Sequence, residues 1–206
     1  MVFKDRMEAA NLLAEKLKTY KDKNAVILAI PRGGVPLGYV IAKELNLPLE
    51  VVLSKKIGHP MHKEFAIGAV TLKTQILSDA ASQVSKSYVA EETEKIRALL
   101  KKRYQEYYGE KSPLVLKDKI LIIVDDGIAT GNTMMSTIEM LYKEQPEKIV
   151  VAIPVSPKST LQKLKNLSFI DEVICLSAPS NFQSVGQFYK NFDQVNDTEV
   201  KFLLNK

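Results

Sequence analysis

The 206-residue sequence contains no tryptophan, two histidines and one cysteine. A single cysteine cannot form a disulfide within the chain or a thiolate metal cluster, and the apolar run EVICL around Cys175 favours a buried structural thiol. Long hydrophobic runs are also missing: KILIIV, at 119–124, is too short to cross a bilayer, and the start MVFKDRMEAANLL lacks the apolar centre of a signal peptide. We therefore expect a cytoplasmic protein without a membrane segment.

The bulk composition is that of an ordinary folded protein. Hydrophobic residues make up 46% and charged residues 26% of the chain, which excludes the disordered and fibrous classes. The formal net charge of +5 suits an anionic ligand, but many soluble proteins carry as much, so charge alone decides nothing. The length allows one domain with a substantial core, and no repeat or linker indicates a second. We predict a single domain over residues 1–206.

Apolar runs alternate with helical patterns along the chain. Strands are predicted at 24–30, 49–55, 66–71, 119–124, 148–154 and 172–176. Helices are predicted at about 5–20, 34–46, 85–108, 133–142 and 159–165. Strands that are apolar on both faces and separated by helices indicate an α/β fold, a doubly wound and mainly parallel sheet covered on both sides.

The most specific segment is ILIIVDDGIATGNT, at 120–133. In a parallel sheet, ligands bind beyond the carboxyl ends of the strands, which is where Asp125 and Asp126 fall. The loop that follows can surround a phosphate with its backbone N–H groups and the hydroxyls of Thr130 and Thr133, at the start of the next helix. Two carboxylates beside a phosphate would repel it unless they bind the hydroxyls of a sugar or a cation. A phosphorylated ribose would fit, because its hydroxyls suit the carboxylates and its phosphate suits the loop. The alternative is a strand end with a charged cap.

Two other nucleotide-binding classes can be tested directly. The chain has no G-x-x-x-x-G-K-[ST] motif, and no G-x-G-x-x-G follows a strand. These absences argue against a nucleoside triphosphatase and against a dinucleotide-binding enzyme.

The segment VDDGIATGNT resembles the ribose-phosphate motif of the type I phosphoribosyltransferases, in which a hydrophobic strand, an acidic pair and a TG-x-T turn follow one another. The similarity extends over nearly the whole chain. It includes the segments FKDRMEAANLLAEKL, AIPRGGVPLGYVIAKEL, KKIGHP, EFAIGAV, IVVAIPVSP and NFQSVGQFYKNFDQVNDTEV. Together these resemble the subgroup of predicted phosphoribosyltransferases whose physiological substrate is generally unassigned.

The resemblance implies an enzyme of nucleotide metabolism that binds phosphoribosyl pyrophosphate with Mg²⁺ and exchanges the pyrophosphate for a nitrogenous, heterocyclic acceptor. Asp125 and Asp126 would hold the ribose hydroxyls and, through water or ribose, the metal. The residues matching the 5′-phosphate loop are Gly127, Ala129, Thr130, Gly131, Asn132 and Thr133.

A second anchor is IPRGGVP, at 30–36, another strand end followed by a helix start. In the family the matching loop takes the pyrophosphate, often through a strained or cis peptide. Arg32 would be a charge-assisted donor there, and Gly33 and Gly34 would expose their amides. Lys55 and Lys56, placed at the end of the second core strand, resemble the basic residues that reach the departing pyrophosphate; the alternative is a solvated strand end.

The general acid or base is not evident from the motifs. The segment IGHPMHKEF matches the mobile loop that closes over the family's site, and its His59, His62 and Glu64 can titrate, although loop histidines are commonly solvated. The hypoxanthine-guanine enzymes have an aspartate at the position of Ala129. The adenine and uracil enzymes have an alanine there, as this chain does. That difference argues against a 6-oxopurine mechanism and leaves the proton to the loop, the hood or the substrate.

The acceptor side is implied by the resemblance, because members of the family place a hood that contacts the base after the last core strand. We expect a core at about 24–176, a helical insertion at about 79–116 and a C-terminal hood at about 177–206. Phe182 of the hood could stack on an aromatic base, and Lys158 could reach a base carbonyl, with packing or solvation as the alternative for each. The insertion could be a lid, part of the hood or the surface of a homodimer.

A regulator that senses phosphoribosyl pyrophosphate and binds nucleic acid is the alternative function, because fold does not fix function. The basic residues argue against nucleic acid, since they are spread along the chain and mixed with acids, as in KKRYQEYYGEK.

Overall fold

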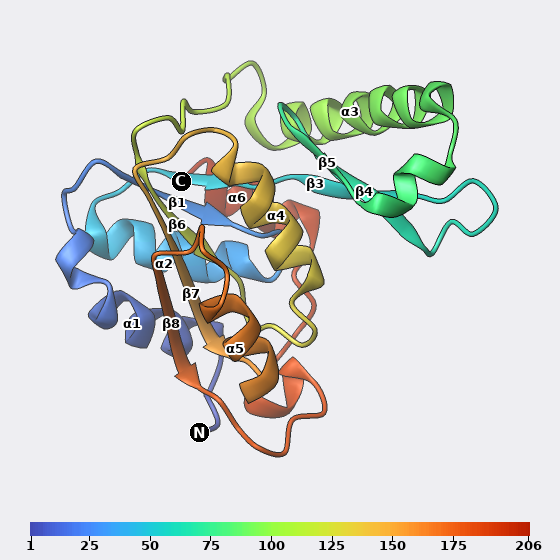
Figure 1. Cartoon of the computed structure of the whole chain (residues 1–206). Helices are drawn as coiled ribbons and strands as arrows, with labels where there is room; N and C mark the ends of the chain where they lie inside the picture. The colour runs from blue at the N-terminus through green and yellow to red at the C-terminus, as the bar shows by residue number, and fades with distance from the viewer.

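The centre of the molecule is a five-stranded parallel sheet with the strand order β2-β1-β6-β7-β8 (Figure 1). The computed structural model describes residues 1–206. The strands, in sheet order, are Leu49–Val51, Ala25–Ala29, Ile120–Val124, Lys148–Val155 and Glu172–Ser177. All five residues of β1 and of β6 are buried, as the apolar runs predicted.

Helices cover both faces of this sheet, which confirms the doubly wound fold. Helices α1 (Arg6–Lys16) and α2 (Gly34–Leu45) pack on one face, where Ile27 and Ile122 meet them. Helices α4 (Asn132–Tyr142) and α5 (Lys158–Lys165) pack on the other, against Val26 and Ile123. Successive side chains of a strand point to opposite faces, so a strand buried on both sides must be apolar throughout.

The strand order creates a switch point between β1 and β6. The chain leaves β1 through α2 toward β2 at one edge, whereas β6 continues through α4 toward β7 and β8 at the other. The two loops that follow β1 and β6 therefore diverge and leave a crevice at the carboxyl ends of these strands, where ligands of open α/β sheets bind.

A projecting arm, residues 54–108, interrupts the parallel sheet after β2 (Figure 1). It consists of an antiparallel sheet of β3 (Ser54–Gly58), β4 (Ala66–Thr71) and β5 (Gln75–Leu77), a 3₁₀ turn (Asp79–Gln83) and helix α3 (Lys86–Tyr108). Helix α3 buries one face, including Ile96, Leu100 and Tyr104, in a cluster with β3 and β4. This helix lies within the range predicted for the insertion.

The structure corrects the second predicted strand. Residues 49–55 do not form one strand of the core: the parallel strand β2 ends at Val51, and β3 begins a separate sheet at Ser54. Lys55 and Lys56 therefore lie within β3 of the arm rather than at the end of a core strand.

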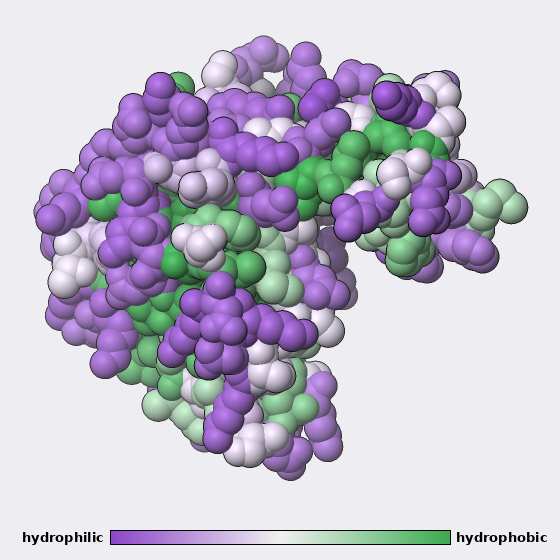
Figure 2. Space-filling model, in the orientation of Figure 1, coloured by the Kyte–Doolittle hydropathy of each residue, from purple (hydrophilic) through white to green (hydrophobic).

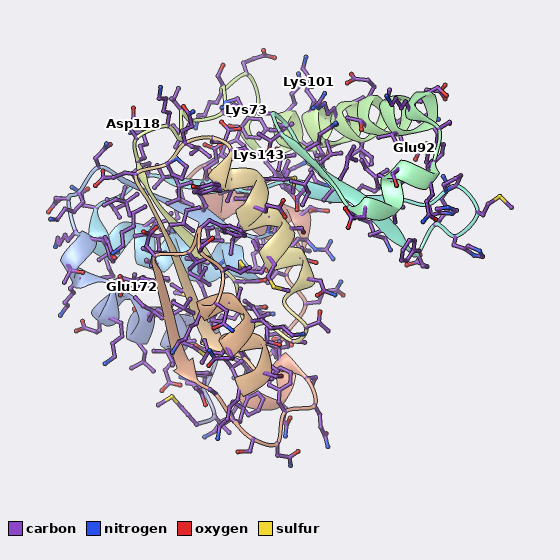
Figure 3. All side chains as sticks on the ribbon, viewed as in Figure 1. Lys73, Glu92, Lys101, Asp118, Lys143 and Glu172 are labelled. Atoms are coloured by element: carbon purple, nitrogen blue, oxygen red, sulfur yellow. The ribbon has the colours of Figure 1, made fainter.

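Polar contacts attach the arm to helix α4. The ammonium group of Lys143, just after α4, donates to the carbonyl of Gln75 on β5 at 2.8 Å, and Lys73 is paired with Glu144 at 3.9 Å. Figure 3 shows Lys73 and Lys143 close together at this junction. The arm thus projects from the core beside the helix that follows the phosphate motif.

The last part of the chain returns to the core. After β8 a 3₁₀ turn (Val185–Phe188) leads to a segment that pairs with the N-terminus, where the N–H of Phe3 donates to the carbonyl of Phe188 at 2.8 Å. Helix α6 (Asp197–Leu204), which the sequence patterns did not predict, packs against α2 and α3. None of the helices combines the length and apolar character that a membrane span requires.

Candidate functional site

The loop after β6 presents its backbone to solvent at the start of α4. Gly131 precedes the helix with a φ of 78°, in the left-handed region that favours glycine, and the helix start has no side-chain cap. Ala129, Thr130 and Asn132 are exposed. Uncapped N–H groups at a helix N-terminus attract anions, so this loop can hold a phosphate.

Helix α5 supports the same loop from the side. The hydroxyl of Thr160 donates to the carbonyl of Ala129 at 2.6 Å, and a Cβ added to Gly131 would lie 2.7 Å from the Thr160 methyl group. The loop is therefore fixed through a carbonyl, which leaves its exposed side free for a ligand.

The acidic pair lies in a confined place at the end of β6. Asp125 accepts a hydrogen bond from the backbone N–H of Asp126 at 2.8 Å. The guanidinium of Arg6, from the first turn of α1, donates to Oδ2 of Asp126 at 3.0 and 2.9 Å, and the Tyr189 hydroxyl donates to the Asp126 carbonyl at 2.6 Å. Asp126 is thus held at both its side chain and its backbone.

Burial governs the electrostatics of this pair. It raises the pKa of the Asp125 carboxyl well above its ordinary value, and the charge of Asp126 raises it further. Burial also raises the pKa of Asp126, while the adjacent Arg6 acts in the opposite direction. Two carboxyl groups this close do not both ionise freely. A cation or a hydroxyl donor that binds between them would stabilise their ionised forms.

The loop after β1 touches the acidic pair directly. The backbone N–H of Ile30 donates to the carbonyl of Val124 at 2.9 Å, and the peptide bond between Pro31 and Arg32 is cis. A Cβ added to Gly33 would lie only 2.0 Å from Oδ2 of Asp126. The two predicted anchors, separated by about 90 residues in the chain, therefore meet at the switch point.

Arg32 extends from this loop and stays accessible. Its side chain is 40% exposed, and its guanidinium lies 3.7 Å from the carboxylate of Asp197 at the start of α6. Asp197 in turn accepts a hydrogen bond from Tyr107 of α3. A half-exposed arginine with one long ion pair can turn toward an anionic ligand at little cost.

A groove of about 530 Å³ separates the arm from the start of α4. Lys56 and Glu64 line it from the arm, and Asn132, Thr133 and Ser136 line it from α4. Figure 2 shows the corresponding face as a hollow below the projecting arm. The ammonium group of Lys56 is paired with the carboxylate of Glu64 at 2.8 Å. Lys56 therefore lies beside the groove, although its strand, β3, is outside the core sheet. Lys55, its neighbour in β3, is exposed.

The connection between β3 and β4 forms the far end of the arm. Its two histidine rings stack with centroids 6.0 Å apart, and the ring nitrogen Nδ1 of His59 accepts the N–H of Met61 at 3.2 Å. His62 and Glu64 are exposed. These three side chains are on the arm, whereas the acidic pair is in the core, and no hydrogen bond or ion pair joins the two groups.

The two residues predicted to bind the acceptor differ in burial. Phe182 is half-buried and stacks on Phe188 with ring centroids 5.4 Å apart, whereas Lys158 is exposed at the first residue of α5. Val185 packs over the loop, because a Cβ on Gly127 would lie 2.5 Å from it.

A sequence model described as the phosphoribosyl transferase domain matches residues 4–190. The chain belongs to the phosphoribosyl transferase domain family. This finding confirms the resemblance carried by VDDGIATGNT and by the fold around it.

Two similar proteins match nearly the whole of this chain. A protein of Mycobacterium tuberculosis, provisionally named a phosphoribosyl transferase, is 33% identical over 211 residues, covering 100% of this chain and 47% of its own length. The chain thus spans about half the length of the curated relatives it matches. The crystal structure of TT1426 from Thermus thermophilus is 36% identical, covers 99% of this chain and 98% of its own, and has a TM-score of 0.86.

A third structure shares the fold alone. It is a protein of Neisseria gonorrhoeae solved with bound ppGpp, with 15% identity, a TM-score of 0.50 and coverage of 100% of this chain and 97% of its own.

The roles of four residues of the candidate site were not predicted from the sequence. Arg6 and Tyr189 bind Asp126, Phe192 lies beneath the Arg6 guanidinium at 4.0 Å from its carbon to the ring centroid, and Asp197 pairs with Arg32. Arg6 and Asp126 are 120 positions apart in the chain. All four lie in segments that carry the family resemblance, FKDRMEAANLLAEKL and NFQSVGQFYKNFDQVNDTEV, so the resemblance was the available signal. It could not give their contacts, because each contact depends on how the ends of the chain fold back onto the sheet.

The donor set at the acidic pair suits magnesium held with its substrate. No cluster of three or more histidine, cysteine, aspartate or glutamate side chains that could hold a metal ion is present. The acidic groups at the end of β6 are the carboxyl groups of Asp125 and Asp126. Mg²⁺ is commonly bound by one or two carboxylates together with substrate phosphates, and these two residues fit that arrangement.

Proposed function

We propose that the protein is a magnesium-dependent phosphoribosyltransferase that transfers the phosphoribosyl group of phosphoribosyl pyrophosphate to a nitrogenous, heterocyclic acceptor and releases pyrophosphate. The observation that carries this proposal is the contact between the two anchor loops. Gly33, after β1, adjoins the carboxylate of Asp126, after β6, at the switch point of the sheet. A ligand there meets phosphate-binding amides, carboxylates and an arginine at once.

Each part of the substrate has residues suited to it. The 5′-phosphate would bind the exposed amides and hydroxyls of residues 127–133, beside the uncapped start of α4. The ribose hydroxyls would donate to Asp125 and Asp126, because ionised carboxylates only accept hydrogen bonds. The pyrophosphate would bind the amides of Gly33 and Gly34 and the guanidinium of Arg32.

The reaction breaks the bond between the anomeric carbon and a pyrophosphate oxygen and forms a bond from that carbon to a nitrogen of the acceptor. Pyrophosphate leaves with the bonding electron pair, so negative charge grows on it while the ribosyl carbon becomes cationic. Bound Mg²⁺ would neutralise part of the pyrophosphate charge. Arg32 would stabilise the leaving group, and the neighbouring carboxylates would stabilise the cationic ribosyl centre.

Two lysines of the arm would support the same leaving group in different ways. Lys56 lines the groove beside α4, whereas Lys55 precedes it on β3, so its side chain points to the opposite face of the strand and would contribute only its charge at longer range. Closing of the arm over this groove would bring the Lys56 charge nearer to the pyrophosphate and would exclude water.

The acceptor would bind on the other side of the ribose, beneath the hood. Phe182 would supply an aromatic surface and Lys158 a donor for a base carbonyl. The proton displaced from the acceptor nitrogen has no carboxylate at residue 129 to take it, since that residue is Ala129. It would pass to solvent or to a group of the substrate or the connecting loop.

The test is calorimetric titration with phosphoribosyl pyrophosphate and Mg²⁺, followed by a pyrophosphate-release assay with a panel of purine, pyrimidine and pyridine bases. Binding with release for one class of base would support the enzyme and identify that class. Binding without release for any base would favour the sensing regulator, and absence of binding would refute the site.

Two substitutions test the assignment within the site. We expect Asp126→Asn and Arg32→Ala to weaken binding of phosphoribosyl pyrophosphate by at least about 10-fold, since each removes a charge-assisted contact. The fold should remain, because Arg32 is half-exposed and asparagine has nearly the shape of aspartate. Unchanged affinity in both variants would show that the ligand binds elsewhere.

A further inference from the structure

Arg6 lies outside both anchor loops, yet it makes the most direct side-chain contact with the acidic pair. It comes from the first turn of α1, and its guanidinium donates through both Nε and Nη2 to Oδ2 of Asp126. The two side chains are only 12% and 14% exposed, so the ion pair is well shielded from solvent. A shielded, two-donor contact constrains the carboxylate more strongly than a surface salt bridge does.

The arginine is itself held on two further sides. Its Nη1 donates to the carbonyl of Asp193 at 2.8 Å, and its guanidinium carbon lies 4.0 Å from the centre of the Phe192 ring. Stacking of this kind suits the flat guanidinium and is not reproduced by a lysine ammonium. Arg6 is therefore fixed by two residues of the predicted hood, and it in turn fixes the Asp126 carboxylate.

Arg6 also determines which oxygen of Asp126 is engaged. Oδ2 is enclosed between the guanidinium and the backbone of Gly33, where an added Cβ would be 2.0 Å away. Arg6 makes both of its carboxylate hydrogen bonds to this oxygen and none to Oδ1. The contact thus fixes the orientation of the carboxylate without engaging its second oxygen.

We propose that Arg6, held by Phe192 and Asp193, is a positioning residue that orients the Asp126 carboxylate for the ribose of phosphoribosyl pyrophosphate. The inference rests on the proposed function. Arg6 acts through Asp126 and does not itself touch the substrate. Its removal should therefore matter only while the Asp126 carboxylate is present.

The experiment is a double-mutant cycle with the full chain, using titration with phosphoribosyl pyrophosphate and Mg²⁺. The variants are Arg6→Gln, Arg6→Lys, Asp126→Asn and the double variant Arg6→Gln/Asp126→Asn. Lys16→Gln is the matched control, because it removes one positive charge from the exposed side of the same helix. Thermal unfolding of every variant is measured alongside.

We expect Arg6→Gln to weaken binding by about 10- to 100-fold, the range typical of residues that orient a ligand-binding group. Arg6→Lys should recover part of that loss, because it keeps the charge but not the two-donor geometry. In the Asp126→Asn background the same Arg6→Gln change should alter affinity by less than about 2-fold. Lys16→Gln should bind as the wild type does.

Other outcomes separate the failures. Equal losses from Arg6→Gln in both backgrounds would overturn the inference, as would wild-type affinity or tighter binding, which would make Arg6 a competitor for the carboxylate. If Arg6→Gln does not fold, Arg6→Lys and Phe192→Leu give the test, and wild-type affinity in both would overturn the inference. Failure of the wild type to bind would refute the proposed function first, and the inference with it.

Discussion

Replacing Gly33 by alanine should damage the site while sparing the fold. The backbone at Gly33 has φ of −61° and ψ of −32°, which alanine adopts without strain. The added methyl group, however, would lie 2.0 Å from Oδ2 and 2.5 Å from Cγ of Asp126. To reach even 3.0 Å, the carboxylate or the loop must retreat by about 1 Å, roughly twice the spread of about 0.5 Å in hydrogen-bond lengths. That displacement also breaks the contact with Arg6.

The expected result is a loss of about 100-fold in affinity for phosphoribosyl pyrophosphate, since a misplacement of about 1 Å at a reacting group has an effect of that size. Calorimetric titration with Mg²⁺ measures the affinity, and thermal unfolding shows whether the fold is preserved. Gly34→Ala is the comparison, because its methyl group would lie 2.6 Å from the backbone carbonyl of Val124 in β6 and should lower stability as well. Wild-type affinity for Gly33→Ala would refute the packing of the glycine loop against Asp126.

Three further changes test other parts of the structure. Thr160→Val removes the hydroxyl that holds the carbonyl of Ala129, and we expect titration to show affinity for phosphoribosyl pyrophosphate weakened by roughly 5-fold, about 1 kcal/mol. Phe182→Ala should reduce the affinity for the acceptor more than that for phosphoribosyl pyrophosphate; equal effects would assign Phe182 to packing on Phe188. Burial raises the pKa of Glu50 above 4.5, so the ionised form is disfavoured in the fold, and wild-type stability should fall as pH rises through the range above 4.5. In denaturant titrations Glu50→Gln should lack this slope, and a parallel dependence of both proteins on pH would contradict it.

Local signals in the sequence defined elements that carry their own start and stop residues. The long helix of the arm was predicted at 85–108 and is found at Lys86–Tyr108, because Ser85 caps its start through the N–H of Tyr88 and Gly109 ends it with a φ of 63°. The fully buried strands β1 and β6 were equally clear, since they are apolar at every position.

The apolar pattern failed to predict which sheet a strand joins, because that depends on the strand with which it pairs. Residues 49–55 were predicted as one strand, but only Leu49–Val51 pairs with β1, and Ser54 begins the strand Ser54–Gly58, which pairs with β4 in the arm. Apolar periodicity indicates that a residue is buried but not which element buries it. It therefore could not locate the boundary between β2 and β3. The short strand β5 also escaped prediction, because three residues give too little periodicity to measure. Helix α6 was missed as well, although it is as long as α5, which was predicted.

The same distinction applies to the site. Asp125 and Asp126 could be predicted because the residues proposed to bind ribose and phosphate follow one another in a single turn, which leaves a readable motif. Arg6 could not, since it reaches Asp126 from the first helix of the chain and depends on Phe192 and Asp193 near its other end. The acidic pair alone would be two crowded, buried carboxyl groups with raised pKa values, and Arg6 opposes that effect on Asp126. The motif therefore names the ligand-binding groups, whereas contacts between the two ends of the chain set the charge and orientation in which they meet the ligand.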